Sequence, residues 1–127
     1  MRADPARILV AEDDFIVAMD VEAALIEAGF GLVGIVASAE AAIELAAAER
    51  PILAVMDVRL AGRRDGIDCA LELFEKHKIR CIFATAHLDE ETRRRAMPAV
   101  PLGWLQKPYT MASLVEIIQI ALGELGR

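Results

Sequence analysis

The amino-acid sequence predicts a single α/β domain, in which a parallel β-sheet carries helices on both faces. Short apolar runs alternate five times with longer segments whose apolar residues have helical spacing, and repeated strand–helix units form parallel sheets with right-handed crossovers. The apolar runs suit inner strands, which are covered on both faces. A length of 127 residues is enough for one ordinary domain, so we expect one domain over residues 1–127.

The first two units are recognisable from apolar spacing and from residues that begin and end helices. An apolar run over residues 8–11 precedes residues 15–28, whose apolar positions share one helix face until a glycine follows. The next apolar run covers residues 32–37. Ser38 then provides a hydroxyl that can cap a helix over the Ala-rich residues 39–49.

The third unit and the fourth strand surround a polar loop. Residues 52–57 form an apolar run that is too short for a helix, begins after a proline and ends in a carboxylate. A Gly- and Arg-rich loop follows, and Asp65 at its end can cap a helix over residues 66–76. Residues 79–85 are the fourth predicted strand.

The last part of the chain contains two helices and a short strand. Residues 87–97 form a polar helix with acidic residues early and arginines late, an order that complements the helix dipole. Pro98 ends this helix. Residues 103–106 are a short fifth strand, and Thr110 caps a final helix that runs to residue 125.

Composition and charge limit the function classes. The formal net charge of −6 and the pI of about 4.9 argue against direct binding of nucleic acid or anionic lipid by this domain. No apolar run approaches the ~20 residues of a membrane span, and no signal peptide precedes the first strand, so we expect a cytoplasmic protein. Cys69 and Cys81 lack CxxC spacing and histidine partners, which predicts buried free thiols in a reducing compartment.

Polar residues follow the predicted strands where they reach one edge of the sheet. In chain order these residues are Glu12, Asp13, Asp57, Thr85 and Lys107. Carboxylates that converge at one edge repel one another and lose solvation, so they need a cation. Oxygen ligands without histidine or cysteine favour Mg²⁺. Open α/β sheets also bind their ligands at this edge.

Asp57 is the candidate reacting group of this cluster. A carboxylate, a Mg²⁺ ion, the ammonium of Lys107 and the hydroxyl of Thr85 meet the needs of a planar phosphoryl group, because its equatorial charge must be stabilised while an oxygen attacks in line. Each residue alone has an ordinary interpretation, as a helix cap, a surface lysine or a strand threonine. Their joint position at successive strand ends favours a site.

At these residues the whole chain resembles the receiver domain of two-component response regulators, which has a flavodoxin-like (CheY-like) fold with strand order 2-1-3-4-5. The resemblance implies that Asp57 is the phosphoacceptor and takes a phosphoryl group from a histidine kinase or a histidine phosphotransfer protein. It implies that Asp13 and Asp57 bind Mg²⁺ directly. Glu12 would act through water, and Arg59 through its backbone carbonyl. Such a domain is not an enzyme beyond catalysing its own phosphorylation and dephosphorylation.

The resemblance also assigns the residues that respond to the phosphoryl group. Thr85 and Trp104 take the switch positions. The alternative interpretation of Trp104 is that its side chain only packs against its neighbours and does not switch. Lys107 takes the position of the family's lysine, and the Lys107–Pro108 peptide bond is prone to be cis. Together these residues would move the fourth strand and fourth helix into a second arrangement.

Several departures from the family pattern bear on kinetics and switching. The loop after Asp57 is slightly longer than in the commonest receivers, with residues 62–64 inserted. Trp104 stands where tyrosine or phenylalanine is usual, and its bulk would restrict the inward rotamer. His87 occupies a position that modulates dephosphorylation in the family. The segment Phe-Ala-Thr-Ala that ends in Ala86 is similar to the FATG-type subgroup of alphaproteobacterial receivers, with alanine in place of its glycine.

Two predicted helices carry more apolar residues than a core needs. The surplus residues are Ile16, Met19, Ala23 and Ile26 on the first helix, and Ile117 and Ile120 on the last. Exposed apolar stripes often mark partner surfaces. In the family that the chain resembles, the first helix meets the kinase or phosphotransfer protein, and the fourth helix, fifth strand and fifth helix bind an effector protein or a second copy. The arginines at 93–95 are interpreted as a solvated face.

Alternative functions remain open from the sequence. A degenerate receiver would bind partners without phosphorylation, which Trp104 and the longer loop allow. A flavodoxin-like cofactor-binding protein would hold a phosphate on backbone N–H groups after the first strand, where the acidic residues 12–14 would repel it. A hydrolase of external phosphate esters would need a separate general acid or base beside Asp57. The chain is either a stand-alone receiver or a fragment of a longer regulator.

Overall fold

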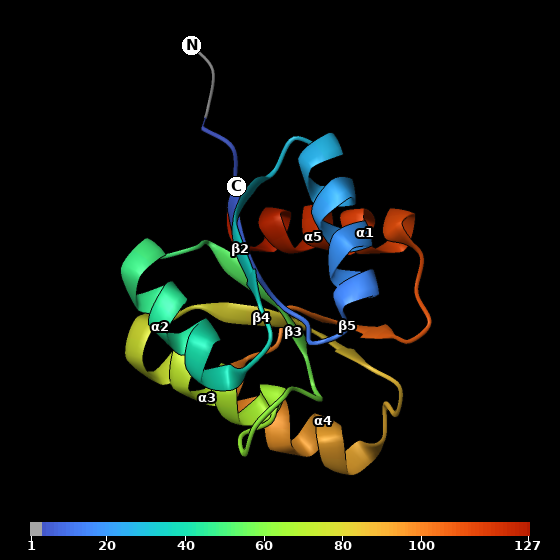
Figure 1. Ribbon diagram of the computed structural model, residues 1–127. Coiled ribbons are helices and arrows are strands. Elements are labelled where there is room, and N and C mark those ends of the chain that lie inside the picture. The colour runs from blue at the N-terminus through green and yellow to red at the C-terminus, as the bar shows by residue number, and fades with distance from the viewer. Residues whose placement is uncertain (1–3) are drawn as a thin grey trace.

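The computed structural model describes residues 4–127 and contains the predicted five-stranded sheet (Figure 1). The strands lie in the order β2-β1-β3-β4-β5, and every neighbouring pair is parallel. Their bounds are β1 Arg7–Ala11, β2 Gly31–Val36, β3 Leu53–Asp57, β4 Arg80–Thr85 and β5 Gly103–Gln106. Residues 1–3 of the predicted domain span lie outside the described residues.

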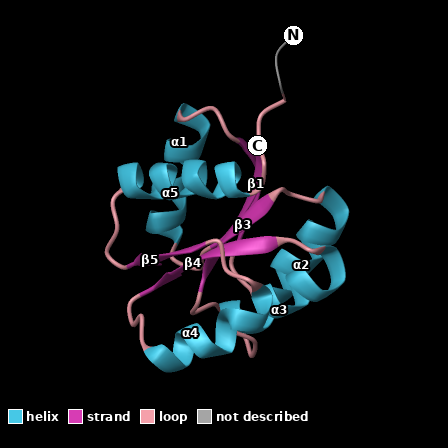
Figure 2. Cartoon of the chain, turned by 180° about the vertical axis from the view of Figure 1, so that it is seen from behind, coloured by secondary structure: helices cyan, strands magenta, loops and turns pink. Residues whose placement is uncertain are grey.

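Helices alternate with the strands along the chain and form the two outer layers. Their bounds are α1 Phe15–Glu27, α2 Ala39–Glu49, α3 Gly66–His77, α4 Glu90–Ala96 and α5 Met111–Glu124. Figure 1 shows α1 and α5 on one side of the sheet and α2, α3 and α4 on the other, and Figure 2 shows the same division from behind. The predicted doubly wound α/β architecture with strand order 2-1-3-4-5 is confirmed.

Alternate residues of the inner strands enter two separate cores. On β1, Leu9 packs with the core under α2 and α3, whereas Val10 packs with the core under α1 and α5. On β4, Phe83 packs with the core under α2 and α3, and Ile82 packs with the core under α1 and α5. These four side chains are almost completely buried. Because helices cover both faces of the sheet, the inner strands are apolar at nearly every position.

Side-chain caps fix where the helices begin. Ser38 and Thr110 each accept a backbone N–H of the first helical turn, at 3.2 and 3.0 Å, as predicted. Asp65 caps α3 as predicted. Asp14 caps α1 by accepting two backbone N–H groups at 2.9 and 3.2 Å, a role that we did not assign from the sequence. Gly29 follows α1 with a φ of 89°, which only glycine adopts without strain.

The fourth helix is shorter than predicted. It begins at Glu90 rather than His87, because Asp89 has extended backbone and its carboxylate accepts the Thr92 N–H at 2.8 Å. A 3-10 turn over residues 97–99 follows the helix. His87 is therefore an exposed loop residue. The other predicted bounds lie within one residue of the observed ones.

The structure also bears on the predicted state of the cysteines and on the predicted lack of a membrane-spanning segment. Cys69 and Cys81 are buried free thiols, as predicted. Burial raises the pKa of the Cys69 thiol to about 12, and burial also raises the pKa of Cys81. None of the helices within residues 4–127 combines the length and the apolar character needed to span a bilayer.

Candidate functional site

Three carboxylates converge at the carboxyl edge of the sheet, as the sequence predicted. Glu12 and Asp13 follow β1 and Asp57 ends β3, and one oxygen of each lies within 4.8 Å of the others. Glu12 and Asp57 are buried, at 5% and 4% exposure, whereas Asp13 is exposed. The Glu12 and Asp57 carboxylates are thus shielded from solvent, whereas the Asp13 carboxylate faces solvent.

Lys107 supplies the positive charge nearest to this cluster. Its Nζ donates to Asp57 Oδ2 at 2.7 Å and lies 3.6 Å from Glu12 Oε1. Burial alone would lower the pKa of Lys107, but the hydrogen bond and charge of Asp57, together with the charge of Glu12, outweigh burial and raise that pKa. The backbone N–H of Lys107 donates to the Thr85 carbonyl at 2.8 Å. β4 therefore positions the lysine.

One ammonium does not balance the charge of the cluster. The pKa of Glu12 is raised to about 7 by burial, with the charge of Asp57 adding to the effect. The backbone N–H of Asp14, which donates to Glu12 Oε2 at 3.0 Å, and the charge of Lys107 both lower it, but less strongly. A cation beside the three carboxylates would remove this penalty, and their oxygen donors fit Mg²⁺. No other group of this kind occurs within residues 4–127.

Backbone groups of neighbouring residues fix the position of Asp57. The Arg59 N–H donates to Asp57 Oδ1 at 3.0 Å, and the Val58 N–H donates to the Ala84 carbonyl at 2.9 Å. Gly66 packs directly on the Asp57 backbone, because a Cβ built on it would lie 1.9 Å from the Asp57 carbonyl oxygen. We did not assign Gly66 to the site from the sequence, where its only signal was a glycine directly after a helix cap.

A cavity of about 210 Å³ opens beside Asp57. Its lining residues are Asp57, Val58, Arg59, Thr85, Ala86, His87, Thr92 and Lys107. Five predicted site residues other than Asp57 itself therefore line one space, and they are joined by Thr92 of α4, which we did not predict as a site residue. The buried Thr85 Oγ1 accepts the His87 N–H at 3.2 Å and lies 3.3 Å from the His87 carbonyl oxygen.

Trp104 is not part of this cavity lining. It is half-buried on β5, and its ring stacks on Phe83 with centroids 4.8 Å apart and 25° between planes. The Arg93 guanidinium lies over the same ring, 5.8 Å from its centroid. Trp104 thus lies between a core aromatic residue and α4. The Lys107–Pro108 peptide bond is cis.

The loop between Asp57 and α3 is tied to neighbouring elements. Ala61 donates its N–H to the Ala37 carbonyl at 3.1 Å and forms a parallel bridge with Ser38. Arg64, one of the inserted residues, pairs with Glu72 of α3 at 2.9 Å. The longer loop therefore contacts the segment between β2 and α2 on one side and α3 on the other.

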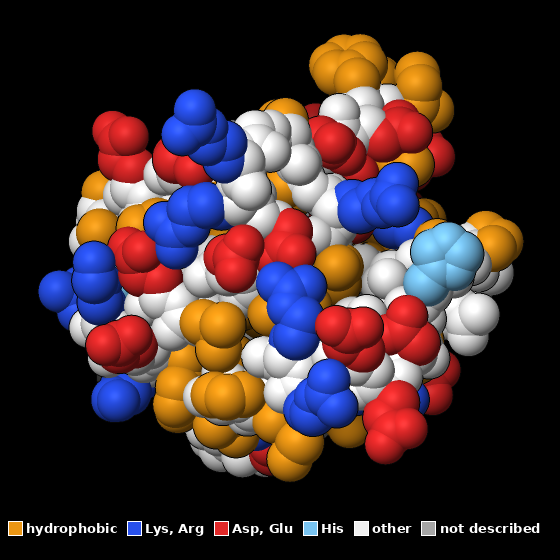
Figure 3. Space-filling model, turned by 90° about the horizontal axis from the view of Figure 1, so that it is seen from below, with side chains coloured by type: hydrophobic (Ala, Val, Ile, Leu, Met, Phe, Trp, Pro, Cys, Tyr) orange, Lys and Arg blue, Asp and Glu red, His pale blue; other side chains and the backbone are white. Residues whose placement is uncertain are grey.

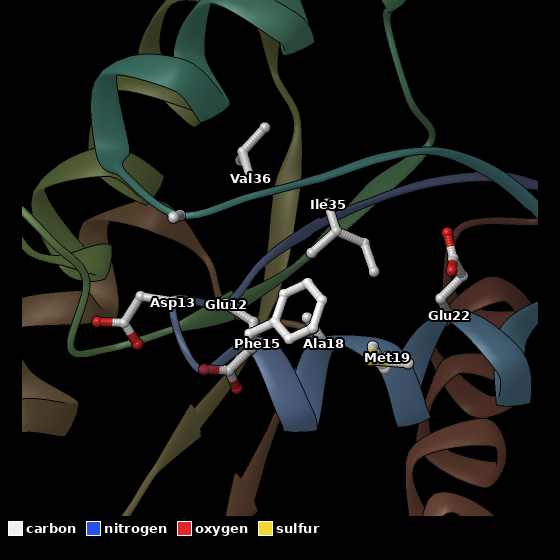
Figure 4. A pocket seen from close by; sticks show the side chains of 9 residues that line it. Glu12, Asp13, Phe15, Ala18, Met19, Glu22, Ile35 and Val36 are labelled. Atoms are coloured by element: carbon white, nitrogen blue, oxygen red, sulfur yellow. The ribbon is translucent and has the colours of Figure 1, made fainter.

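A groove lies between α1 and β2 next to the acidic pair (Figure 4). Phe15 and Met19 of α1 and Ile35 of β2 form its apolar part, and Glu12 and Asp13 lie at one end. Phe15 is 74% exposed, and the predicted surplus residues Ile16, Met19, Ala23 and Ile26 of α1 are also exposed. The groove brings an apolar surface directly beside the acidic site.

The prediction for α5 is correct for one residue and wrong for the other. Ile120 is exposed, as expected. Ile117 is half-buried and covers Gly103 of β5, where a Cβ would meet the Ile117 side chain at 2.8 Å. The absence of a side chain at Gly103 makes room for Ile117, so this isoleucine belongs to the core rather than to a free surface.

Comparison with known proteins finds a matching family model and longer proteins that are similar to this chain. The sequence model of the response regulator receiver domain matches residues 8–119. The transcriptional regulatory protein PdtaR of Mycobacterium tuberculosis is 36% identical over 120 residues, which cover 94% of this chain and 58% of the relative. The phyllosphere-induced regulator PhyR of Methylorubrum extorquens is 31% identical over 125 residues, which cover 96% of this chain and 46% of the relative. The chain spans about half the length of these relatives.

Solved structures agree with the fold over nearly the whole chain. The signal receiver domain of a modulated diguanylate cyclase from Desulfovibrio desulfuricans has a TM-score of 0.86 at 30% identity, with 95% of this chain and 96% of that chain covered. A CheY-like receiver domain protein from Methanospirillum hungatei has a TM-score of 0.88 at 22% identity, with 94% and 95% covered, and supports the fold alone. This chain belongs to the response regulator receiver domain family.

Proposed function

We propose that this domain accepts a phosphoryl group on Asp57 from a phosphohistidine of a histidine kinase or a histidine phosphotransfer protein. The observation that carries the proposal is a buried carboxylate at a strand end, 2.7 Å from Lys107 and grouped with two further carboxylates. A carboxylate placed between an ammonium and a cation can approach a phosphoryl group without prohibitive repulsion. Membership of the receiver family adds support.

In this proposal the phosphorus–nitrogen bond to the donor imidazole breaks as an Asp57 oxygen forms a bond to phosphorus. Asp13 and Asp57 would hold Mg²⁺, with Glu12 acting through water and Arg59 through its backbone carbonyl, and the ion would supply positive charge for the phosphoryl oxygens. Lys107 then moves its ammonium from the free carboxylate to a phosphoryl oxygen. The imidazole leaves on the donor protein, so the domain turns over no external substrate and is not an enzyme in the usual sense.

The output of the domain is proposed to be protein binding. The Thr85 hydroxyl would leave the His87 backbone to bind a phosphoryl oxygen, and the movement would reach α4, Trp104 and the α4–β5–α5 face. Met97 and Val100 lie between α4 and β5 in the chain, Ile120 lies on α5, and all three are exposed apolar residues. They would meet an effector protein or a second copy. The net charge of −6 speaks against nucleic acid as the direct partner.

The α1 surface is the proposed docking site for the phosphoryl donor. Its apolar residues flank the groove that ends at Glu12 and Asp13 (Figure 4), so a bound helix would reach the phosphoacceptor.

The similarity to PhyR and the segment ending in Ala86 support assignment to the FATG-type subgroup. The two longer relatives are compatible with either a stand-alone receiver or one part of a longer regulator. A cytoplasmic location fits a kinase partner.

A phosphorylation-independent interaction module is the alternative. The observation that favours it is the position of Trp104 between Phe83 and Arg93, which limits rotation of the ring. Binding of partners would then depend on the surface of α1 or α4 alone, and the site would hold a metal ion without switching.

Fluorescence of Trp104, the only tryptophan, distinguishes these two functions. Mg²⁺ and then beryllofluoride, a mimic of the acyl phosphate, are added to the wild type and to Asp57→Asn. The proposed function predicts a saturable change with each addition, the second absent in the variant. A response to Mg²⁺ without one to beryllofluoride, together with no phosphate incorporation from acetyl phosphate, would establish the alternative.

A further inference from the structure

Helix α4 is held to the domain by little apolar packing. Only Ala96 of its seven residues is buried, and most of the others are charged. A helix this short is not stable by itself in water, so polar contacts with neighbouring elements determine where it lies. Figure 3 views the molecule from below, where α4 lies, and acidic and basic side chains are interleaved on that face.

Arg95 makes the polar contact that joins α4 to α3. Its Nη2 lies 3.0 Å from Asp65 Oδ2 and 3.5 Å from Asp68 Oδ1. The remaining oxygens of the same two carboxylates form the capping box of α3, because Asp65 Oδ1 accepts the Asp68 N–H at 2.9 Å and Asp68 Oδ2 accepts the Asp65 N–H at 3.2 Å. One guanidinium therefore bridges both members of the cap, and Arg95 is not the purely solvated residue that we expected.

The contact connects two walls of the cavity beside Asp57. Asp65 directly precedes Gly66, which packs on the Asp57 carbonyl, so the cap belongs to the wall that positions Asp57. On the other side, α4 carries Thr92, which lines the cavity, and follows the loop that begins directly after Thr85, the last residue of β4. Arg95 is thus a bridge between the backbone behind Asp57 and the element that follows Thr85.

In this structure, the Thr85 hydroxyl is bonded to the His87 backbone, at 3.2 and 3.3 Å. To bind a phosphoryl group on Asp57, this hydroxyl must leave His87, which lies two residues before the cap of α4 at Asp89. Movement of the loop therefore displaces the start of α4, and the ion pairs of Arg95 resist that displacement.

We propose that Arg95 is a positioning residue that latches α4 to the capping box of α3 and thereby favours the unphosphorylated arrangement of Thr85. This inference rests on the proposed function, because it concerns the conformational change that follows phosphorylation at Asp57. By linkage, a contact present only in the resting arrangement weakens binding of any ligand that selects the other arrangement. Removing the latch then strengthens that binding.

The test is the affinity for beryllofluoride in saturating Mg²⁺, followed by ¹⁹F NMR so that the readout does not depend on Trp104. Arg95→Ala is compared with the wild type, with Arg95→Lys and with Arg94→Ala. Arg94 is the matched control because it lies on the same exposed helix and forms no ion pair within residues 4–127. Thermal unfolding checks that each variant is folded.

Arg95→Ala is expected to bind beryllofluoride about two- to fivefold more tightly, the range that follows from the strength of an exposed ion pair. Arg95→Lys keeps a cation that can bridge both carboxylates and stays close to the wild type. The sign is informative, because loss of a positive charge alone is expected to weaken binding of an anion, and Arg94→Ala measures that effect. In the unligated domain, amide hydrogen exchange in α4 is faster for Arg95→Ala than for Arg94→Ala.

Equal or weaker binding by Arg95→Ala, in a domain whose wild type binds beryllofluoride, would overturn the latch and leave the proposed function intact. Unchanged exchange in α4 of Arg95→Ala would overturn it as well, without reference to any ligand. A wild type that does not bind beryllofluoride at all would overturn the proposed function first and the latch with it.

Discussion

Gly66 of α3 lies against the backbone of Asp57, so closely that a Cβ on Gly66 would be 1.9 Å from the Asp57 carbonyl oxygen. The Gly66 N–H also donates to the Val58 carbonyl at 2.8 Å. The first residue of α3 therefore fixes the backbone that carries the Asp57 carboxylate. Any side chain at this position must displace either α3 or Asp57.

The substitution Gly66→Ala tests this relationship. Overpacking of this kind costs about 1–3 kcal/mol of unfolding free energy, and the displaced Asp57 should bind Mg²⁺ and beryllofluoride more weakly. Gly123→Ala is the control, because Gly123 lies in α5 and a Cβ there meets nothing within 4 Å; it should add about 0.5–1 kcal/mol of stability. Denaturant unfolding and a Mg²⁺ titration measure both effects, and normal metal affinity in folded Gly66→Ala would contradict the account.

Glu12 should make the stability of the metal-free domain depend on pH. Burial raises its pKa from 4.5 to about 7, so its contribution to stability is fully present below pH 4.5 and is lost as pH rises through 7. With a chelator present, Glu12→Gln should remove this loss between pH 5 and 8. The free energy of unfolding of the two proteins, measured by urea at several pH values, should diverge as pH rises. Parallel profiles would exclude Glu12 as the cause.

Mg²⁺ should oppose the same pH dependence in the wild type. The ion favours the charged carboxylate, so its stabilisation grows as pH rises from 5 to 8 and falls when Glu12 is replaced by glutamine. A shift in unfolding midpoint that is independent of pH would place the ion elsewhere.

The α1 surface should matter for transfer from a protein donor and not for transfer from a small molecule. Met19 is 54% exposed, so Met19→Asp should change stability by less than about 0.5 kcal/mol. Labelling by acetyl phosphate should remain normal, whereas transfer from a phosphorylated histidine kinase should slow. Ile120→Asp, at an apolar residue of α5 that is 63% exposed, is the control and should leave transfer unchanged.

Cys69 and Cys81 should be unreactive in the folded domain. Burial raises the pKa of Cys69 to about 12 and also raises that of Cys81, so almost no thiolate is present near neutral pH. Both thiols should react with a thiol reagent only at the rate of unfolding, and both should react at once in denaturant. Rapid reaction of one thiol in the native protein would show local opening of α3 or β4.

The sequence allowed prediction of the strands and of the residues at their ends. Inner strands are recognisable as short apolar runs, and the carboxyl ends of parallel strands meet at one edge of the sheet. Glu12, Asp57, Thr85 and Lys107 lie at one edge for this reason. The start of α4 was misplaced because the charged residues around Asp89 have no apolar periodicity, so the cap alone decides where the helix begins.

Contacts through the backbone could not be predicted from residue types. Nothing in the sequence distinguishes Gly66 from an ordinary first residue of a helix, since its role depends on the path of the loop that returns to Asp57. Thr92 reaches the cavity only because α4 begins where it does. Ile117 was assigned to the surface by its spacing, whereas the missing side chain of Gly103 admits it to the core.

If Asp57 takes up a phosphoryl group in the presence of Mg²⁺, the mass of the protein must increase by that group. Intact-protein mass spectrometry after incubation with acetyl phosphate measures this increase, with Asp57→Asn and a chelator as the two controls. We expect one added phosphoryl group in the wild type, lost on mild alkaline treatment, and none in either control. Equal labelling of Asp57→Asn, or no labelling of folded wild type with Mg²⁺ bound, would show that Asp57 is not the phosphoacceptor.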